Sequence, residues 1–328
     1  MQARVVSPAE PVRAPDYPLE IQRADLAPYR NSNTGVDYVH SFDSGVPGHH
    51  VMVNALTHGN EWCGMVVVKR LLDARLQPQA GRLTLSFANI AAYEKQAEDG
   101  SSVRFVGRDF NRLWHDDLLR RDTESVEAVR AHQMRPFVQR VDRLLDLHST
   151  WHALSPFFVM SQLPRVRQLA DQLATPPRQL FLPDVWHEGY HLIDYGAFRD
   201  PRSLAVGLIA ECGQHFAQSS VDTAWQTTIR FLQVNGTIDA VTAADLCFHL
   251  ASGVAIERYE IVLPVIAQTD ALRLTCSYAG FVHFAQGEVA AMDGDQQVLA
   301  PFDGAVLLAP RPDPKAGQQA FSWGRSVT

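Results

Sequence analysis

Residues 50–76 read HVMVNALTHGNEWCGMVVVKRLLDARL, and this stretch contains a strand, a turn and a helix in succession. The apolar run at 50–56 is typical of a buried strand, and the residues at 61–76 predict a helix. Between them, His58 and Glu61 stand three positions apart, where the chain leaves the strand and enters the helix. A strand followed at once by a helix is the repeating unit of an α/β domain.

The same alternation continues on both sides of this stretch. Further strands are predicted at 83–89, 141–148, 156–161 and 206–211, and further helices at 123–140, 164–174 and 222–244. Strands that alternate with helices favour a mostly parallel sheet flanked by helices. We therefore expect one α/β catalytic domain over residues 31–250.

Both ends of the chain depart from this pattern. Residues 1–30 are rich in Pro and polar side chains, which predicts a loosely packed arm. Residues 251–328 contain short alternating segments separated by Gly, Asp and Pro, with strands predicted at 260–267, 273–277, 280–284 and 304–308. The tail is therefore predicted to be a small all-β domain of the barrel or sandwich type.

Composition limits the partners. The chain has 328 residues, 46% hydrophobic and 20% charged, with a net charge of −7, which argues against nucleic acid or anionic membrane as partners. No run resembles a signal peptide or reaches transmembrane length. The four cysteines include no CxxC pair and are expected to be reduced thiols in a cytoplasmic protein. A homo-oligomer remains open.

Two short motifs supply candidate metal ligands. His58 and Glu61 in LTHGNEWCG are one helical turn apart, although a surface histidine beside a first-turn glutamate would look the same. His148, in DLHST, ends the predicted strand 141–148, where a hydrogen-bonded structural histidine is the simpler interpretation. Together they provide two imidazoles and one carboxylate, with a fourth position left for water, as a catalytic zinc site requires. We expect one Zn²⁺ per chain, with another divalent ion as the alternative.

The segment 103–114, VRFVGRDFNRLW, concentrates positive charge in an acidic chain. Arg104, Arg108 and Arg112 fall within nine positions, with Asp109 and Asn111 among them. Arginine binds carboxylates through paired hydrogen bonds, and asparagine offers further donors. A solvated charged loop remains the alternative, and for Arg108 it is the preferred one. Asp109 either orients a metal-bound imidazole or pairs with an arginine.

A carboxylate follows the last predicted strand of the α/β region. In GLIAECGQH, at residues 207–215, Glu211 ends an apolar run and should lie at the carboxyl edge of the sheet. There it could take a proton from water and return it to a leaving nitrogen, or form a structural pair with Arg202. Cys63 and Cys212 adjoin these motifs and are interpreted as small packing residues.

These four features, in this order, resemble the succinylglutamate desuccinylase and aspartoacylase family, relatives of the zinc carboxypeptidases. The matching pattern is HGNE, then Arg104 with the DFNR of 109–112, then His148, then Glu211. The resemblance implies a zinc-carboxypeptidase-like mixed sheet flanked by helices and a smaller all-β C-terminal domain. It also implies hydrolysis of the amide bond of a small N-acyl amino acid, of N-acetyl or N-succinyl type.

The resemblance assigns roles to individual residues. It implies that His58, Glu61 and His148 are the zinc ligands and that Glu211 is the general base and acid. Arg104 would then polarise the scissile carbonyl and stabilise the developing oxyanion.

The implied substrate-binding residues are Asn111, Arg112 and, with an interval one residue shorter than in aspartoacylase, Arg202. The segment ECGQH departs from the Gly–Pro-type residues usual in aspartoacylases, and neither Tyr259 nor Tyr278 matches the context of their pocket-closing tyrosine. We therefore expect a deacylase other than aspartoacylase itself.

Two other functions fit part of this pattern. A metallocarboxypeptidase would use the same metal group and the Asn111–Arg112 pair to hold a peptide C-terminus. A non-catalytic carboxylate-binding protein would keep the arginines, but it would not need Glu211 as a base. The absence of a GxSxG elbow and of a GK[ST] phosphate loop argues against serine hydrolases and P-loop enzymes.

Overall fold

A computed structural model describes residues 16–183, 189–247 and 255–328. It divides into two compact units. The larger contains Pro18–Thr150 and Pro156–Ile256, and the smaller contains Glu257–Thr328 with Trp151–Ser155 and residues 16–17. The domain boundary expected at 250/251 and the first fifteen residues of the expected arm lie outside the described residues.

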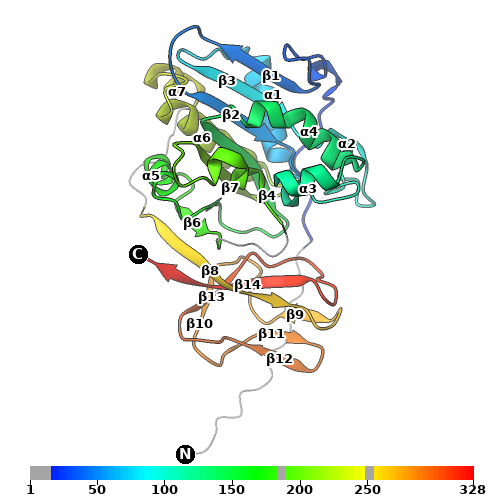
Figure 1. Cartoon of the computed structure of the whole chain (residues 1–328). Coiled ribbons are helices and arrows are strands. Elements are labelled where there is room, and N and C mark those ends of the chain that lie inside the picture. The colour runs from blue at the N-terminus through cyan, green and yellow to red at the C-terminus, as the bar shows by residue number, and fades with distance from the viewer. Residues whose placement is uncertain (1–15, 184–188, 248–254) are drawn as a thin grey trace, which may run out of the picture. The chain divides into compact units, whose positions relative to one another are not determined.

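The larger unit is built on a mixed sheet with the strand order β1-β3-β2-β4-β7-β5-β6 (Figure 1). Neighbouring strands run parallel at β3-β2, β2-β4, β4-β7 and β5-β6, and antiparallel at β1-β3 and β7-β5. The strands are β1 (Val39–Asp43), β2 (His50–Ala55), β3 (Arg82–Phe87), β4 (Arg143–Thr150), β5 (Phe157–Met160), β6 (Arg178–Phe181) and β7 (Val206–Gln214). The expected mixed α/β sheet is confirmed.

Helices lie against this sheet. They are α1 (Trp62–Asp73), α2 (Ile90–Glu94), α3 (Asp116–Arg121), α4 (Val126–Val138), α5 (Pro164–Leu173), α6 (Gln218–Val234) and α7 (Ala240–Leu246), with short 3₁₀ turns η1 (Ala27–Tyr29), η2 (Phe110–Arg112), η3 (Leu192–Asp194) and η4 (Gly196–Phe198). Helix α1 packs against β2, β4 and α6. A Cβ at Gly64 would lie only 2.7 Å from Leu147 Cβ, so this glycine allows α1 to approach the sheet closely.

Most predicted elements are present within a few residues of their expected bounds, and the differences have local causes. The helix expected at 222–244 is two helices, because Gly236 adopts a positive φ of 72° and Asp239 caps a new helix by accepting a hydrogen bond from Thr242 N. Strands β1 and β6 were not predicted, since they have only five and four residues and lack a clear apolar alternation.

The expected loose arm is wrong for residues 18–30. Ile21 and Leu26 are buried, and the backbone N–H groups of Glu20 and Ile21 donate to the carbonyl oxygen of Phe216. The segment is rich in proline and polar residues, but it also contains two apolar side chains, those of Ile21 and Leu26, and both are buried in the larger unit. Burial of those side chains offsets the entropy lost when the segment becomes ordered.

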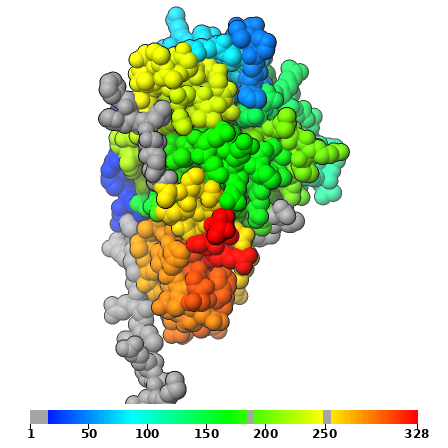
Figure 2. Space-filling view, turned by 90° about the vertical axis from the view of Figure 1, so that its left-hand side faces the viewer, coloured from blue at the N-terminus to red at the C-terminus, as the bar shows by residue number. Residues whose placement is uncertain are grey.

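The smaller unit is all-β, as expected. One sheet has the order β8 (Glu257–Ile266), β14 (Gln319–Val327), β13 (Ala305–Leu308) and β10 (Val282–Phe284), and another has β12 (Gln296–Leu299), β11 (Val289–Asp293) and β9 (Leu272–Leu274). Their paired strands are antiparallel. The core includes Phe321, Trp323 and Tyr278. Residues 257–328, coloured from yellow through orange to red, form one contiguous body in the space-filling view (Figure 2).

Among the described residues, the helices are all too short or too polar to cross a membrane.

Candidate active site

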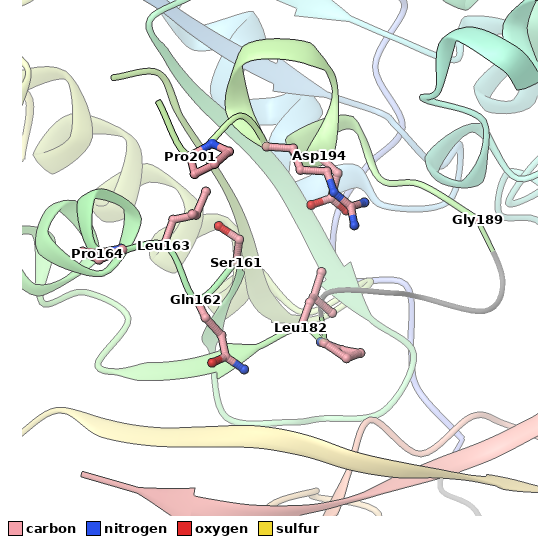
Figure 3. Close-up of a pocket in the computed structure, with 10 residues that line it drawn as sticks. Ser161, Gln162, Leu163, Pro164, Leu182, Gly189, Asp194 and Pro201 are labelled. Atoms are coloured by element: carbon pink, nitrogen blue, oxygen red, sulfur yellow. The ribbon is translucent and has the colours of Figure 1, made fainter. Parts of the chain in front are cut away.

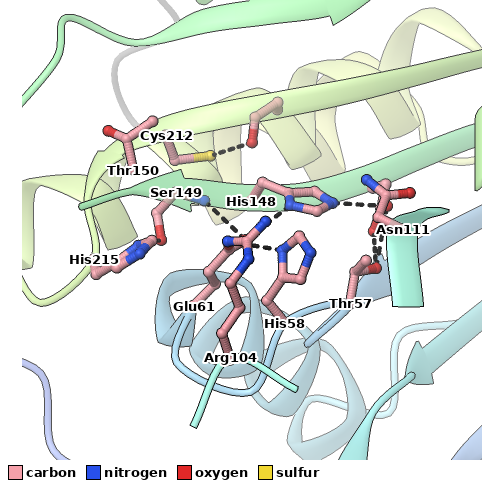
Figure 4. A network of polar contacts seen from close by, with 12 residues as sticks. Thr57, His58, Glu61, Arg104, Asn111, His148, Ser149, Thr150, Cys212 and His215 are labelled. Carbon is pink, nitrogen blue, oxygen red and sulfur yellow. Dashed lines mark hydrogen bonds and ion pairs between the residues drawn. The ribbon is translucent and has the colours of Figure 1, made fainter. Parts of the chain in front are cut away.

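His58, Glu61 and His148 meet at one point of the larger unit (Figure 4). All three side chains are buried, and one ligand atom from each lies within 4.8 Å of the others. Glu61 lies between the two imidazoles: its Oε1 is 2.8 Å from His58 Nδ1 and its Oε2 is 2.8 Å from His148 Nδ1. The residues predicted from two separate motifs are thus brought together.

The backbone between β2 and α1 explains this convergence. Leu56, just after β2, has a φ of 58°, a conformation that non-glycine residues seldom adopt and that turns the chain sharply. Gly59 follows, and a Cβ there would lie 2.4 Å from Val103 O, so only glycine fits. Glu61 is the N-cap residue of α1. A strained turn at this position is typical of a functional site.

The outer nitrogen of each imidazole is bonded to a second carboxylate. His58 Nε2 lies 2.9 Å from Asp109 Oδ1, and His148 Nε2 lies 2.8 Å from Asp146 Oδ2. A carboxylate can only accept, so each Nε2 donates its proton outwards, while each Nδ1 faces Glu61 and is the nitrogen that could bind a metal ion once it has lost its proton. Two such imidazoles beside a carboxylate match the donor set of a divalent metal ion, and carboxylate partners of this kind orient metal-binding histidines.

Asp146 is a site residue that the sequence interpretation missed. It is completely buried on β4, and it accepts hydrogen bonds from Asn54 Nδ2 at 2.8 Å and from Thr57 Oγ1 at 2.8 Å. Asn54 and Asp146 are register partners on neighbouring strands. The signal was present in DLHST, because residues two apart in a strand point to the same face and Asp146 precedes His148 by two.

The surroundings of Glu61 and His148 favour the charged form of both side chains. Burial by itself would raise the pKa of Glu61, but the two adjacent imidazoles hold that pKa well below its usual range. Burial would likewise lower the pKa of His148, but Asp146 and Glu61 hold it well above its usual value. The group therefore combines the buried negative charge of Glu61 with cationic partners in His148 and Arg104, and a bound metal ion would replace the Nδ1 proton of His148 as a partner of Glu61.

Glu211 lies beside His148 on the neighbouring parallel strand. The two residues are register partners of β7 and β4, so their side chains share one face of the sheet. Oε2 of Glu211 is buried and has no hydrogen-bond partner among the described residues. Burial raises the pKa of Glu211 to about 8, and the nearby Glu61 adds to the shift while His148 and Arg104 oppose it. A carboxyl group with a buried oxygen and a raised pKa, beside a candidate metal site, fits a proton-transfer residue.

Arg104 and Asp109 complete the group on the side opposite β4. Arg104 Nη1 donates to Glu61 Oε1 at 3.1 Å, and Nη2 lies 3.4 Å from Asp109 Oδ2. The Arg104 side chain is 41% exposed, so its guanidinium lies at the open side of the site. Asp109 bridges Arg104 and His58, which combines the two roles considered for it from the sequence.

Asn111 and Arg112 follow at once in the 3₁₀ turn η2. Asn111 is buried, and its Oδ1 accepts a hydrogen bond from Leu192 N at 2.8 Å, so its side-chain carbonyl holds the first residue of η3. Arg112 Nη1 donates to the carbonyl oxygen of Asn111 at 2.9 Å. Arg108 points away, as expected: it pairs with Asp122 and is 46% exposed.

Arg202 is not brought to this group. Its side chain is 89% exposed and pairs with Asp200 two residues earlier, at 3.2 Å. Asp200 also accepts from the backbone N–H of Arg202, which closes a local turn in which the guanidinium has a partner of its own. The substrate-binding role expected from the resemblance therefore lacks structural support. The pairing with Glu211, the alternative considered, is wrong for the same reason.

Two further histidines lie close to the site. Nδ1 of His215 is 2.8 Å from Ser149 Oγ, and the backbone N–H of Ser149 donates to Glu61 Oε2 at 3.3 Å. Burial lowers the pKa of His215 to about 3, so this imidazole is neutral. His191 is buried beside η3 and bonds Asp194 through Nδ1 at 3.0 Å. The sequence did not single out either histidine. The partner of His215, Ser149, is distant in the chain, and the partner of His191, Asp194, lies in a 3₁₀ turn that was not predicted.

Cys63 and Cys212 are both buried near the site. The thiol of Cys63 lies 3.4 Å from the carbonyl oxygen of His148, and that of Cys212 lies 3.3 Å from the carbonyl oxygen of Ala210. Burial raises the pKa of the Cys212 thiol well above its usual value, which makes it a poor nucleophile. These contacts fit the packing role expected for both cysteines.

A separate cavity of about 440 Å³ lies between η3, the start of α5 and the ends of β5 and β6 (Figure 3). Ser161, Leu182 and Asp194 are among its lining residues. None of the described lining residues belongs to the His58–Glu61–His148 group. Ser161 follows the far end of β5, whereas Phe157 at the other end is the register partner of Glu211. The cavity is therefore distinct from the site.

Comparison with known proteins supports the assignment of the fold. Residues 47–185 match the family model described as the succinylglutamate desuccinylase/aspartoacylase catalytic domain. A curated succinylglutamate desuccinylase of Vibrio cholerae is 21% identical over 297 residues, which cover 83% of this chain and 79% of that protein.

Solved structures agree at the level of the fold. A succinylglutamate desuccinylase/aspartoacylase from Rhodobacter sphaeroides has a TM-score of 0.65 at 17% identity, covering 89% of this chain and 90% of that one. The succinylglutamate desuccinylase from Vibrio cholerae has a TM-score of 0.64 at 19% identity, covering 89% and 86%. An ectoine utilization protein from Ruegeria pomeroyi, described as product-bound, has a TM-score of 0.63 at 16% identity, covering 88% of each chain.

The mixed sheet and its buried His-Glu-His group define an α/β protein with a candidate metal centre beside the carboxyl group of Glu211. Within that class, the chain is similar to the succinylglutamate desuccinylase/aspartoacylase family, whose catalytic-domain model matches residues 47–185.

Proposed function

We propose that this protein hydrolyses the amide bond of a small N-acyl amino acid and that it uses one Zn²⁺ held by His58, Glu61 and His148. The observation that carries the proposal is Glu211, whose buried Oε2 has no hydrogen-bond partner among the described residues although it lies beside the three proposed ligands. A buried carboxyl oxygen without a partner is costly, and its retention is explained by a role in the reaction.

The three proposed ligands favour zinc over harder cations. Two imidazole nitrogens and one carboxylate form the ligand set of catalytic zinc sites, whereas Mg²⁺ and Ca²⁺ prefer oxygen ligands. When bound, the ion supplies Lewis-acid chemistry, because it polarises the amide carbonyl and lowers the pKa of water. Asp109 and Asp146 bind Nε2 of His58 and His148, which would leave Nδ1 of each histidine to hold the ion.

Glu211 moves the proton in this mechanism. Its carboxylate takes a proton from the attacking water as the C–O bond forms, and the carboxyl group then returns it to the leaving nitrogen as the C–N bond breaks. The products are a carboxylic acid and a free amine. The raised pKa of Glu211 suits the return of the proton, and a divalent cation held by the neighbouring residues would lower that pKa and so favour the carboxylate that takes the proton.

Arg104 stabilises the charge that develops on the carbonyl oxygen. Its guanidinium stands at the open side of the group, held against Glu61 and Asp109, so it is already oriented before substrate binds. A fixed donor of this kind costs no reorganisation during the reaction. Asn111 and Arg112, on the adjacent turn, are proposed to hold the substrate carboxylate.

The proposal is tested by the release of free amine from a panel of N-acetyl and N-succinyl amino acids, with ordinary dipeptides in the same panel. We expect the zinc-loaded protein to act on one N-acyl amino acid faster than on any dipeptide, and a chelator to remove the activity. Faster cleavage of dipeptides would assign a metallocarboxypeptidase instead. Binding of carboxylates without turnover by the zinc-loaded protein would assign a non-catalytic binder.

Two arginines give a direct contrast. Arg104→Ala is expected to lower kcat by about 10²–10³-fold, because it removes a donor aimed at the developing oxyanion. Arg202→Ala is expected to leave kcat/KM within about twofold, because Arg202 is exposed and paired with Asp200, and exposed ion pairs contribute little. Steady-state kinetics on the best substrate of the panel measures both. A large loss in Arg202→Ala would restore the substrate-binding role implied by the family resemblance.

A further inference from the structure

Residues 104–109 form an arch, with Arg104 at one end and Asp109 at the other. Both ends carry side chains of the site, and these side chains approach each other at 3.4 Å between Arg104 Nη2 and Asp109 Oδ2. The carbonyl oxygen of Arg104 accepts a hydrogen bond from Gly59 N at 3.0 Å, which ties the first end to the turn that carries His58. The shape of the arch therefore sets where the guanidinium and the Asp109 carboxylate lie.

The middle of this arch, residues 106–108, is bound by a carboxylate from another part of the chain. Glu127, in the first turn of α4, is completely buried. Its Oε1 accepts from Val106 N at 2.6 Å, and its Oε2 accepts from Gly107 N at 3.2 Å and from Arg108 N at 3.1 Å. Successive backbone N–H groups that converge in this way form a concave anion site, and here the protein's own carboxylate fills it.

Two more features hold Glu127 itself in place. Asn89, the N-cap residue of α2, donates through Nδ2 to Glu127 Oε1 at 3.3 Å. Ser125 caps α4 by accepting from Ala128 N, so the carboxylate of Glu127 also lies at the positive end of that helix. The arch is thus connected through one buried side chain to the N-termini of two helices.

The ion pair between Arg108 and Asp122 also holds the middle of the arch, but it is weaker. Arg108 pairs with Asp122, but the arginine side chain is 46% exposed, and exposed ion pairs contribute little because solvent screens them. The bonds to Glu127 are charge-assisted and buried, and buried charge-assisted hydrogen bonds are the stronger kind. Glu127 is therefore the main anchor of the backbone at residues 106–108.

We propose that Glu127 is a positioning residue: by binding the backbone N–H groups of residues 106–108, it holds Arg104 and Asp109 against the His58–Glu61–His148 group. Glu127 touches none of those three residues and acts only through the arch. The inference rests on the proposed function for the roles of Arg104 and Asp109. The hydrogen bonds from Glu127 to the backbone of residues 106–108, which we call the clamp, can be measured without any activity.

The first test compares Glu127→Gln with Glu124→Gln, a control just before the same helix whose side chain is exposed. Glu127→Gln keeps the size but loses the charge and one acceptor oxygen. We expect kcat/KM to fall by about 10–100-fold, since a misplacement of 1 Å can cost about 10²-fold, while zinc affinity changes by less than tenfold. Glu124→Gln should match the wild type. Wild-type kinetics in Glu127→Gln would overturn the proposal.

A double mutant separates positioning from a general loss of stability. If Glu127 acts through Arg104, then Glu127→Gln should cost less than about threefold in a background that already carries Arg104→Ala. Fully additive losses would mean that Glu127 acts independently of Arg104, and would refute the positioning role. If Glu127→Gln does not fold, Glu127→Asp keeps the charge on a shorter side chain, and the same comparison with Arg104→Ala applies.

Hydrogen exchange tests the clamp independently of catalysis. The amides of residues 106–108 should exchange at least tenfold faster in Glu127→Gln, and those of the neighbouring strand β2 should not change. Unchanged exchange at 106–108 would refute the clamp. Faster exchange in a protein whose wild type hydrolyses no N-acyl amino acid would instead count against the proposed function, and leave the clamp in place.

Discussion

Glu211→Gln is expected to lower kcat by about 10²–10⁴-fold and to leave zinc affinity within a few-fold of the wild type. A positioned carboxyl group that transfers a proton contributes a rate factor of that size. Glutamine has the same shape but neither accepts nor returns the proton. Glu211 is the register partner of His148 and is not one of the three proposed ligands, so the metal should remain. Turnover of the zinc-loaded variant and a zinc competition assay measure the two effects.

The same substitution changes how stability depends on pH in chelator-treated protein. The pKa of Glu211 is raised by burial from its usual 4.5 to about 8 in the folded chain. Between these values the folded state holds a proton that the unfolded state has released, so the stability present below about pH 4.5 is lost as the pH rises towards 8. Glutamine does not titrate, so the stability of Glu211→Gln should not fall over this pH range for that reason. Thermal unfolding at pH 5 and pH 8.5 should therefore show a larger drop in Tm for the wild type.

Either of two results would contradict the role of Glu211. One is turnover of Glu211→Gln within tenfold of the wild type while zinc is verified as bound. The other is an equal drop in Tm for both proteins between the two pH values, which would mean that Glu211 is ionised in the metal-free site.

His148→Ala is expected to abolish stable zinc binding and, with it, all chelator-sensitive activity. Loss of an outer partner of a ligand typically costs 10–100-fold in metal affinity, and loss of a ligand itself should cost more. The variant also leaves the buried Asp146 and Glu61 carboxylates without their shared imidazole partner, so the metal-free protein should be less stable. Zinc content after dialysis, zinc titration and thermal unfolding check these effects.

His283→Ala serves as the matched control, because it removes an exposed imidazole from strand β10 in the smaller unit. It should bind zinc and turn over like the wild type. If His148→Ala retained one zinc per chain at wild-type affinity, the ligand assignment would be wrong. If it lost zinc but kept full activity, the metal would have no part in the reaction.

Local sequence determined the elements of the larger unit and the candidate ligands on them. The run at 50–56 followed by HGNE predicted strand β2, the turn and helix α1, since strand and helix periodicities are properties of a few neighbouring residues. His58 and Glu61 lie three positions apart in the sequence, which predicted that they are close; the structure brings them together through the turn between β2 and α1 rather than through a turn of helix. His148 and Glu211 were placed on strands correctly, although both strands extend beyond them, to Thr150 and Gln214.

The tertiary structure decided which polar side chains support the site. Asp146 became the partner of His148, and Glu127 the anchor of the arch, through strand register and helix packing that join residues distant in the chain. The same packing left Arg202 at the surface with Asp200, although its sequence context resembled that of a substrate-binding arginine. A motif specifies which chemical groups are available. Whether a group is buried, and which partner it meets, depends on long-range contacts that local spacing does not encode.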